Sequence, residues 1–372
     1  MIHPPGPEHG PVPDAHPREQ RPIVVGIMYP SAWDIRPASE LAADLDAVRA
    51  LDPRLEIVDC RYVEPEELRT ARGRPDAATR PALRELAPVL TAEQRNLLAR
   101  AEIVLVADLP FDVADLAPRL RWVQSCAAGN GQLLSAGLPT ERIRLTTAAG
   151  VNGAPIAEFV FARLLAFFKR HRDLDALQDT RRWKPAFGGL VRGKTLGLIG
   201  VGGIGSQLAC RAQAFGMIVH ATRRRVEVPA EYVDRLFHPD DLHEMLAGCD
   251  AVVSAAPETA DTVGTMNAAA FAAMREGAFY CNVGRGSFVV EPDLIAALRG
   301  GRLGGAALDV VAAEPLPADD PLWDAPNLYL SAHCSSAALE HFTEVFRLFR
   351  DNLARYLAGE ELRNRVDPDA GC

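Results

Sequence analysis

The sequence predicts an α/β protein of two domains, each with a parallel β-sheet covered by helices on both faces. With 372 residues, the chain is longer than a domain built around one hydrophobic core usually is. Short apolar runs alternate with helical patterns along almost the whole chain, which is typical of buried parallel strands joined by helical crossovers. A long apolar helix from about Asn152 to Arg170 divides this alternation into two series, and such a helix suits a position packed between two domains.

The first series predicts the smaller domain. Its expected strands are Ile23–Met28, Leu55–Val58, Ile103–Ala107, Trp122–Ser125 and Ile143–Thr147, and its expected helices are Pro37–Leu51 and Thr91–Arg100. Arg69–Pro81 is rich in Arg, Ala and Pro, which predicts a surface excursion.

The second series begins at Lys194 and predicts the larger domain. Its expected strands are Thr195–Ile199, Met217–Ala221, Asp234–Phe237, Ala251–Ala255, Ala278–Asn282, Gly305–Asp309 and Leu328–Ser331, and its helices include Ile204–Phe215, Asp240–Leu246 and Pro292–Arg299. A last helix, about Leu339–Leu357, is expected to return to the first domain. We therefore expect residues 22–148, completed by 337–372, to form one domain and residues 149–336 the other. The Pro-rich residues 1–21 are expected to be a disordered tail.

Composition excludes several classes of function. The formal net charge of −9 argues against nucleic acid or an anionic membrane as the main partner, because both need a basic face. The N-terminus lacks the apolar segment of a signal peptide, and no apolar run reaches the length of a membrane span. The seven cysteines show no CxxC spacing, which indicates reduced thiols in a cytoplasmic protein and argues against a metal site.

A glycine motif follows the first strand of the second series. Gly200, Gly202 and Gly205 form a G-x-G-x-x-G sequence, with Gly203 and Ile204 between them, after an apolar strand and before a helix. Gly200 would allow a tight turn, Gly202 the approach of a pyrophosphate, and Gly205 close packing of helix and strand. The helix N-terminus would then offer N–H groups to the phosphates. This context predicts a Rossmann-type dinucleotide-binding domain; the alternative is a glycine-rich turn without a ligand.

The end of the next strand points to NADP rather than NAD. An NAD site places an acidic residue there for the ribose hydroxyls, whereas this chain has Thr222, Arg223 and Arg224. Arginine pairs well with a 2′-phosphate, and Thr222 could add a hydroxyl donor. We expect NADP to be preferred, with NAD possible; the alternative is a solvated basic turn.

Three later segments each place a reactive side chain after an expected strand. They supply Arg285, Glu314 and His333 at the carboxyl edge of the sheet, where ligands bind in open α/β folds. Taken singly, such residues are more often solvated loop charges or structural histidines. Because all three residues follow expected strands, together they predict a catalytic site. The remaining histidines that could be considered lack this context and receive no role: His171, His220, His238, His243 and His341.

Several spaced motifs in this order resemble the D-isomer-specific 2-hydroxyacid dehydrogenase family, with similarity to its glyoxylate/hydroxypyruvate reductase-like and phosphoglycerate dehydrogenase-like members. They are AAGNG at 127–131, GVNGAPIAE at 150–158, GVGGIG at 200–205, PETADTVG at 257–264, NVGRG at 282–286, LDVVAAEPLP at 308–317 and SAH at 331–333. One departure is Ala332, where many relatives have proline.

This resemblance implies roles for named residues. Arg285, Glu314 and His333 would be the catalytic set, with Arg285 also binding substrate. The backbone N–H groups near Ala128, Gly129 and Asn130 would hold the substrate carboxylate. Besides the glycine motif and the basic turn, the cofactor-binding residues would be Ala256, Pro257, Thr262, Val283 and Asp309, with Asp309 beside the nicotinamide. The smaller domain would be a flavodoxin-like lid, and the assembly a homodimer.

The implied reaction is hydride transfer between NADP(H) and a small 2-keto or 2-hydroxy acid, D-specific and reductive, with acids such as glyoxylate or hydroxypyruvate as substrates. Histidine can deliver a proton near neutral pH, a neighbouring carboxylate favours its protonated form, and arginine fits a planar carboxylate. Two alternatives stay open. One is a catalytically weak nicotinamide-sensing interaction protein on the same scaffold, and the other is a phosphite-type dehydrogenase. Formate is disfavoured because formate enzymes of this scaffold generally have Gln in place of Glu314.

Overall fold

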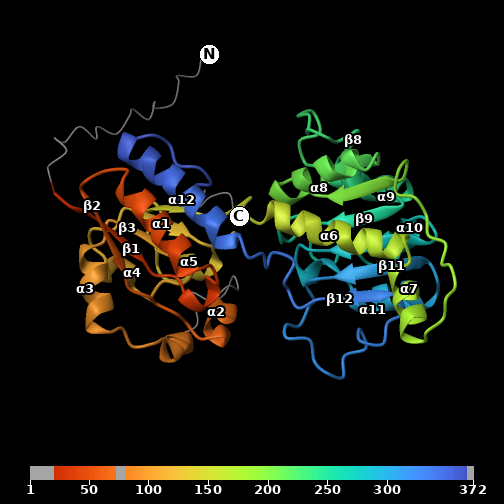
Figure 1. The fold of residues 1–372 in the computed structure, drawn as a ribbon, viewed down its shortest axis with the longest axis horizontal. Helices are drawn as coiled ribbons and strands as arrows, with labels where there is room; N and C mark the ends of the chain where they lie inside the picture. The colour runs from red at the N-terminus through yellow and green to blue at the C-terminus, as the bar shows by residue number, and fades with distance from the viewer. Residues whose placement is uncertain (1–20, 73–80, 367–372) are drawn as a thin grey trace, which may run out of the picture.

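The fold was taken from a computed structural model that describes residues 21–72 and 81–366. The predicted N-terminal tail, apart from Arg21, lies outside the described residues. Two α/β bodies stand side by side, each with its own parallel sheet, and two chain segments cross between them (Figure 1). The predicted fold class is confirmed.

The first body has a five-stranded parallel sheet in the order β2-β1-β3-β4-β5. Its strands are β1 (Ile23–Ile27), β2 (Leu55–Asp59), β3 (Ile103–Val106), β4 (Trp122–Ser125) and β5 (Arg144–Thr146). Its helices are α1 (Ala38–Arg49), α2 (Glu66–Arg72), α3 (Ala92–Arg100), α4 (Val113–Leu116) and α5 (Gly131–Leu134), with 3-10 turns at Ser31–Trp33 and Pro81–Leu86.

The two faces of this sheet belong to separate hydrophobic cores, because successive side chains of a strand point to opposite faces of the sheet. Along β1, Val25 packs with Phe346 and Phe349 of α12 (His341–Ala358), whereas Val24 packs with Leu97 and Leu98 of α3 on the opposite face. The C-terminal helix thus covers the N-terminal sheet, as its blue ribbon beside the red and orange strands shows (Figure 1).

A buried polar network ties α12 to this sheet. The Asn352 side chain donates to Oε1 of Gln124 at 3.1 Å and accepts from the backbone N–H of Arg363 at 2.8 Å. Thr146 donates to the same Gln124 oxygen at 2.7 Å and accepts from the indole of Trp122. Because Asn352 and Gln124 are fully buried, loss of either partner would leave unpaired polar groups in the core.

The second body has a seven-stranded parallel sheet in the order β12-β11-β10-β9-β6-β7-β8. Its strands are β6 (Thr195–Ile199), β7 (Ile218–Thr222), β8 (Arg235–Phe237), β9 (Ala251–Ser254), β10 (Ala278–Asn282), β11 (Leu303–Leu308) and β12 (Leu328–Leu330). Its helices are α6 (Gly153–Phe168), α7 (His171–Asp179), α8 (Gly203–Ala214), α9 (Leu242–Ala247), α10 (Ala268–Ala273) and α11 (Glu291–Arg299), with 3-10 turns at Pro239–Asp241 and Gly286–Phe288.

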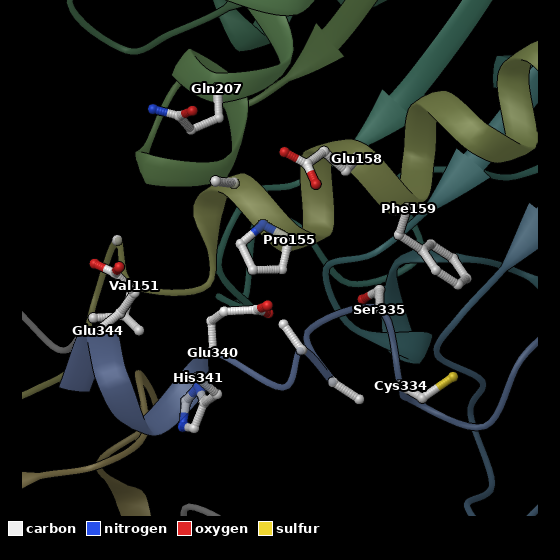
Figure 2. Close-up of a pocket in the computed structure, with 14 residues that line it drawn as sticks. Val151, Pro155, Glu158, Phe159, Gln207, Cys334, Ser335, Glu340, His341 and Glu344 are labelled. Atoms are coloured by element: carbon white, nitrogen blue, oxygen red, sulfur yellow. The ribbon is translucent and has the colours of Figure 1, made fainter. Parts of the chain in front are cut away.

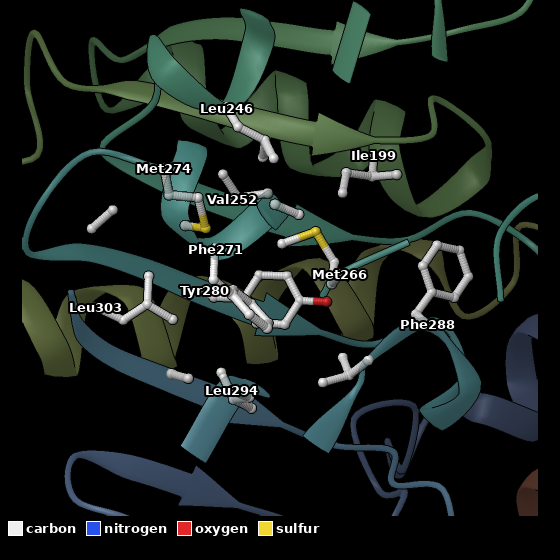
Figure 3. Packing of buried hydrophobic residues seen from close by; sticks show 14 of the residues in the cluster. Ile199, Leu246, Val252, Met266, Phe271, Met274, Tyr280, Phe288, Leu294 and Leu303 are labelled. Carbon is white, nitrogen blue, oxygen red and sulfur yellow. The ribbon is translucent and has the colours of Figure 1, made fainter. Parts of the chain in front are cut away.

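Helices cover both faces of this sheet. On one face α6 and α8 bury side chains such as Val160 and Leu208 against the strands. On the other face α9, α10 and α11 enclose a core in which Phe271 meets Tyr280 edge-on (Figure 3). The order of the strands reverses between β9 and β7, on either side of β6, which makes the carboxyl end of β6 the expected place for a ligand.

One prediction is wrong in part. Arg69–Pro81 is not wholly a surface excursion, because Arg69 to Arg72 form the end of α2 and Arg72 is buried. The Arg72 guanidinium pairs with the buried carboxylate of Glu64 and donates to the carbonyl oxygens of Leu109 and Gln132 at 2.8 Å. Four acceptors, counting Ser135 Oγ at 3.0 Å, offset the cost of burying the charge. Residues 73–80 of the predicted excursion lie outside the described residues, and Pro81 begins a 3-10 turn.

Within residues 21–72 and 81–366, no helix combines the length and the apolar character that crossing a membrane would require.

Candidate active site

The glycine turn after β6 has the shape of a phosphate cradle. Gly200 has φ of +98°, and a Cβ there would lie 2.9 Å from Ala256 on the neighbouring strand end. A Cβ at Gly205 would lie 2.3 Å from the carbonyl oxygen of Gly200, so α8 packs directly on the turn. At Gly202 a Cβ would meet no heavy atom within 4 Å. This geometry matches the tight turn and the close packing expected of Gly200 and Gly205, and it leaves open space at Gly202.

The start of α8 adds the electrostatic part of the cradle. Gly202 is the N-cap of a 12-residue helix and supplies no side-chain cap, so the N–H groups of the first helical residues, Gly203, Ile204 and Gly205, have no partner within the helix. Helix N-termini carry partial positive charge and favour phosphates. A pyrophosphate therefore fits this cradle by shape and by charge.

The end of β7 brings basic side chains to the same edge. Thr222 is buried, and its hydroxyl accepts a hydrogen bond from the N–H of Gly200 at 3.3 Å, so it helps to hold the glycine turn. Arg223 is half-buried and donates to the carbonyl oxygen of Val228 at 3.2 Å. Arg224 is exposed and forms no hydrogen bond or ion pair with the described part of the chain. Arg224 is thus the more available of the two guanidinium groups.

His333 and Glu314 form a pair on the same sheet edge, beyond β12 and β11. The Nδ1 atom of His333 lies 2.9 Å from Oε2 of Glu314. Both side chains remain partly exposed, His333 by 50% and Glu314 by 38%. His333 has φ of +49°, a left-handed conformation that is unfavourable for a residue with a side chain and is found mainly where surrounding contacts impose it.

Asp309 supplies those contacts. Its buried carboxylate accepts from the hydroxyl of Ser331 at 2.6 Å and from the backbone N–H groups of Cys334 and Ser335 at 3.0 and 2.9 Å. Its backbone oxygen accepts from the N–H of His333 at 2.8 Å. Burial alone would raise the pKa of Asp309, but these hydrogen bonds outweigh burial and hold its pKa below the usual value. The carboxylate therefore stays charged and holds the turn that carries His333.

Two further residues hold the segments of Arg285 and Glu314. Asn282 donates to the carbonyl oxygen of Arg285 at 2.8 Å and accepts from the N–H of Gly284 at 3.0 Å. Glu291, at the start of α11, accepts from the N–H of Ala312 at 2.8 Å, two residues before Glu314. Asn282 lies in the NVGRG motif, but its positioning role was not foreseen. Glu291 gave no recognisable signal, because it resembles any acid in the first turn of a helix.

The remaining cofactor candidates follow β9 and β10, which lie between β6 and β12 in the order of the sheet. Val283 is buried, and its N–H donates to the carbonyl oxygen of Ser254 at the end of β9. Ala256 is half-buried and packs against Gly200, and Pro257 is exposed. The Thr262 hydroxyl donates to the carbonyl oxygens of Thr259 and Pro257 at 3.0 and 3.1 Å, which closes the loop after β9.

The predicted substrate loop belongs to the other body. Ala128 and Gly129 are exposed and Asn130 is half-buried, directly after β4. Asn130 is the N-cap of α5, so the loop ends in a short helix that is fixed by Arg72 through the carbonyl oxygen of Gln132. The loop and the His333 segment therefore come from different bodies, and a substrate that touches both would lie between them.

A cavity of about 600 Å³ lies where the chain crosses between the two bodies. Figure 2 shows it between the start of α6, with Val151 and Pro155, and the start of α12, with Glu340 and His341. Cys334, the residue after His333, also lines it, but Arg285, Glu314 and His333 do not. The cavity thus belongs to the crossing and lies next to the catalytic candidates.

Comparisons with known proteins agree with this geometry. A sequence model described as D-isomer specific 2-hydroxyacid dehydrogenase, NAD binding domain, matches residues 161–335. A glyoxylate/hydroxypyruvate reductase A from Salmonella paratyphi B is 32% identical over 243 residues, which are 64% of this chain and 75% of that protein.

Solved structures give the same result over nearly the full length. A D-isomer specific 2-hydroxyacid dehydrogenase family protein from Aeromonas salmonicida is 29% identical with a TM-score of 0.72, covering 94% of this chain and 99% of its own. A D-isomer specific 2-hydroxyacid dehydrogenase from Xanthobacter autotrophicus, solved with NADPH and MES, is 27% identical with a TM-score of 0.71, covering 95% of this chain and 100% of its own.

Proposed function

Because the chain belongs to the family of D-isomer specific 2-hydroxyacid dehydrogenases, we propose that it reduces a small 2-keto acid with NADPH. Glyoxylate and hydroxypyruvate are the first candidates, since the Salmonella relative is named for them. The product would have the D configuration wherever the new alcohol carbon is chiral. The observation that carries this proposal is the 2.9 Å contact between His333 and Glu314 on the sheet edge that also holds Arg285.

His333 is proposed to give a proton to the substrate carbonyl oxygen. Glu314 engages Nδ1, which fixes the orientation of the ring and leaves Nε2 to face the substrate. Glu314 itself accepts from the N–H of Val311 at 3.2 Å, so its carboxylate is held in place. When bound, NADPH supplies the hydride that the carbonyl carbon receives. The carbonyl oxygen would take the proton of His333, so that the keto acid becomes a hydroxy acid.

Arg285 is proposed to bind the substrate carboxylate and polarise the adjacent carbonyl. Its backbone is fixed by Asn282, and its exposed guanidinium, whose Nη1 donates to the carbonyl oxygen of Gly284 at 2.8 Å, keeps further donors for a planar carboxylate. The N–H groups near Ala128, Gly129 and Asn130 would hold the same carboxylate from the other body. Closure of the two bodies would then bring these donors together and exclude water from the reacting atoms.

NADPH is proposed over NADH because of the basic turn after β7. Arg224 is exposed and Arg223 adjoins it, whereas the acidic residue typical of NAD sites is missing. The Xanthobacter structure, which was solved with NADPH, supports this choice. Comparison of kcat/KM for the two cofactors checks it: Arg224→Ala should raise the KM for NADPH more than the KM for NADH, and equal kcat/KM values in the unchanged protein would refute the preference.

We also propose that the protein is a homodimer, because one segment of the described chain exposes several large apolar side chains. The chain from α7 to residue 190 carries Trp183, Phe187 and Leu190, which are among the most exposed large apolar side chains of the described residues, and α7 buries no residue. A second copy of the chain would cover such a surface, and two-fold pairing is the commonest assembly. Light scattering should give the mass of a dimer, and Trp183→Ser with Phe187→Ser should shift it toward the monomer.

A substrate panel tests the proposed function. Glyoxylate, hydroxypyruvate, pyruvate, longer 2-keto acids and matched aldehydes would be offered with NADPH, and the glycerate product would be analysed on a chiral column. We expect the acids to be turned over faster than the aldehydes, because an aldehyde has no carboxylate to bind the remaining donors of Arg285. Faster turnover of the aldehydes, or an L product, would contradict the assignment.

A further inference from the structure

Arg72 is a buried arginine that the proposed reaction does not use. It is the last residue of α2 and is 1% exposed. The helix α2 lies beside α5, the short helix that follows the proposed carboxylate-binding loop Ala128–Asn130 (Figure 1). The family motifs found in the sequence do not include Arg72. Because a charged side chain is buried only where partners offset the loss of water, its contacts show what it holds.

The Arg72 guanidinium donates to three segments of the first body. Its Nη1 atom pairs with the buried carboxylate of Glu64 and donates to the carbonyl oxygen of Leu109 at 2.8 Å. Its Nη2 atom donates to the carbonyl oxygen of Gln132 at 2.8 Å, and its Nε atom donates to Ser135 Oγ at 3.0 Å. Glu64 follows β2 and Leu109 follows β3. Gln132 lies within α5, and Ser135 is its C-cap residue. One side chain therefore ties the ends of two strands to α5.

The part of this network that belongs to the sheet is fixed by further buried contacts. The carboxylate of Glu64 accepts from the hydroxyl of Tyr62 at 3.0 Å, and the N–H of Glu64 donates to Oδ2 of Asp108 at 3.2 Å. All three of these residues are buried. The guanidinium of Arg72 also lies over the ring of Phe111, 4.3 Å from its centroid. The sheet thus sets the position of Arg72, and Arg72 in turn sets the position of α5.

The proposed substrate loop is anchored on both sides. Before the loop, the carbonyl oxygen of Ala127 accepts from the N–H of Ala148 at 3.0 Å. After the loop, the anchor is the carbonyl oxygen of Gln132. It accepts both from Arg72 and from the hydroxyl of Ser135, the latter at 2.9 Å. If the second anchor were lost, α5 and the loop before it would be held mainly from the side of β4.

The loop has two open backbone donors between these anchors. Among residues 21–72 and 81–366, no hydrogen bond uses the N–H groups of Ala128 and Gly129. We propose that Arg72 is a positioning residue, which holds these N–H groups where the substrate carboxylate arrives. The inference rests on the proposed reduction of a 2-keto acid, because that function gives the loop its carboxylate. Arg72 does not touch the reacting atoms and acts through Gln132 and Ser135.

Arginine suits this role because its donors point in fixed directions. A lysine has one compact ammonium group, which can keep the pairing with Glu64 but does not reproduce the spread of donors toward Gln132 and Ser135. Arg72→Lys should therefore keep the buried charge paired and loosen the hold on α5. This variant separates the positioning of the loop from the loss of a buried charge.

Three further variants complete the test. Arg69→Lys is the matched control, because Arg69 belongs to the same helix and pairs with a buried acid, Asp108, at 2.7 Å. Its other hydrogen bond goes to the carbonyl oxygen of Glu64 and not to α5. Ser135→Ala removes one half-buried contact of Arg72, so it carries the test even if Arg72→Lys does not fold. Ser135→Thr keeps the hydroxyl group and is the conservative variant.

Two kinds of measurement are made on each protein. Kinetics give kcat, the KM for NADPH and the KM for the keto acid, which is glyoxylate or hydroxypyruvate, whichever is turned over faster. Hydrogen exchange is followed without ligand at the amides of residues 133–135, whose N–H groups donate to the carbonyl oxygens of Asn130 and Gly131. The exchange readout does not depend on any activity.

For Arg72→Lys we expect the KM for the keto acid to rise about tenfold, the size of one lost hydrogen bond to a charged group, with the KM for NADPH unchanged. Exchange at residues 133–135 should be faster. Ser135→Ala should show the same changes with a rise in KM of about twofold to fivefold, whereas Ser135→Thr and Arg69→Lys should match the original protein. Loss of stability alone would reduce the amount of folded protein, and hence the apparent kcat, without raising KM.

The proposal and the function on which it rests fail in different ways. Unchanged exchange at residues 133–135 in Ser135→Ala and in any folded Arg72→Lys would overturn the positioning role, and so would equal changes in Arg69→Lys. If the protein reduces no keto acid but exchange still responds to Arg72 and Ser135, the proposed function fails and the hold of Arg72 on the loop stands. If reduction is observed and the KM for the keto acid does not respond, the positioning role fails alone.

Discussion

Gly202 and Gly205 belong to one glycine motif, yet the structure predicts different effects for the same substitution. A Cβ at Gly202 meets no atom within 4 Å, and its φ of −102° is accessible to alanine. A Cβ at Gly205 would lie 2.3 Å from the carbonyl oxygen of Gly200, so backbone would have to move. Gly202→Ala therefore tests the cofactor cradle, whereas Gly205→Ala tests the packing of α8 on the turn.

Gly202→Ala should weaken the binding of NADPH, whereas Gly205→Ala should lower the stability of the protein. In Gly202→Ala, alanine is a poorer N-cap than glycine, which lowers the free energy of unfolding by up to about 1 kcal/mol. Alanine also reduces the backbone entropy of the unfolded chain, which raises the free energy of unfolding by about 0.4–1 kcal/mol. The two contributions nearly cancel, so stability should change little. The methyl group occupies space that a phosphate needs, and one lost hydrogen bond to a charged group costs about 1.5–3 kcal/mol. We therefore expect the Kd of NADPH to rise roughly tenfold to a hundredfold. In Gly205→Ala, overpacking should cost about 1–3 kcal/mol of stability.

NADPH fluorescence titration gives the Kd, and urea unfolding gives the free energy of unfolding for each variant. If Gly202→Ala folds normally and binds NADPH as tightly as the original protein, the pyrophosphate does not lie at this turn. If Gly205→Ala is as stable as the original protein, the steric reasoning about α8 is wrong.

Three further predictions concern the site and its scaffold. Glu314→Gln should lower kcat by roughly tenfold to a hundredfold with the Kd of NADPH unchanged, measured by steady-state kinetics and titration, because His333 loses its charged partner. Asn352→Leu should lower the free energy of unfolding by about 2–4 kcal/mol in urea, because it leaves buried partners unpaired, whereas Leu at the exposed Asn96 should have little effect. Asp309 has a folded-state pKa below the reference 3.8, so its stabilisation is complete above that pH and is lost as the pH falls through the folded value. Asp309→Asn should thus destabilise the protein at pH 7, and unfolding curves at decreasing pH should show the difference shrinking in acid.

Much of the fold could be predicted from the sequence because parallel strands buried on both faces appear as continuous apolar runs. β4, β6 and β10 begin and end at the predicted residues, and all three are fully buried. The helix α2 was missed because its seven residues, EELRTAR, contain only two apolar residues, Leu68 and Ala71, too few to show a helical repeat. The burial of Arg72 depends on its pairing with Glu64, which is eight residues away and gives no periodic signal.

The candidate site was predictable to a similar extent. Short motifs fixed which side chains follow which strand, and parallel pairing of β10, β11 and β12 then brings Arg285, Glu314 and His333 to one edge. The sequence could not show what holds them. Asp309 was expected beside the nicotinamide, and its place there stays a prediction; the structure adds that its carboxylate holds the turn around His333. Such contacts join residues far apart in the chain, so they follow only from the folded arrangement.

His333 is proposed to give a proton to a 2-keto acid while NADPH is oxidised. The most direct test is the loss of reduced-nicotinamide absorbance with glyoxylate or hydroxypyruvate, compared between the original protein, His333→Ala and the exposed control His243→Ala. We expect His333→Ala to lower kcat by at least about a hundredfold with the Kd of NADPH unchanged, and the control to behave like the original protein. Full turnover by His333→Ala, or no keto-acid reduction by the original protein, would contradict the account.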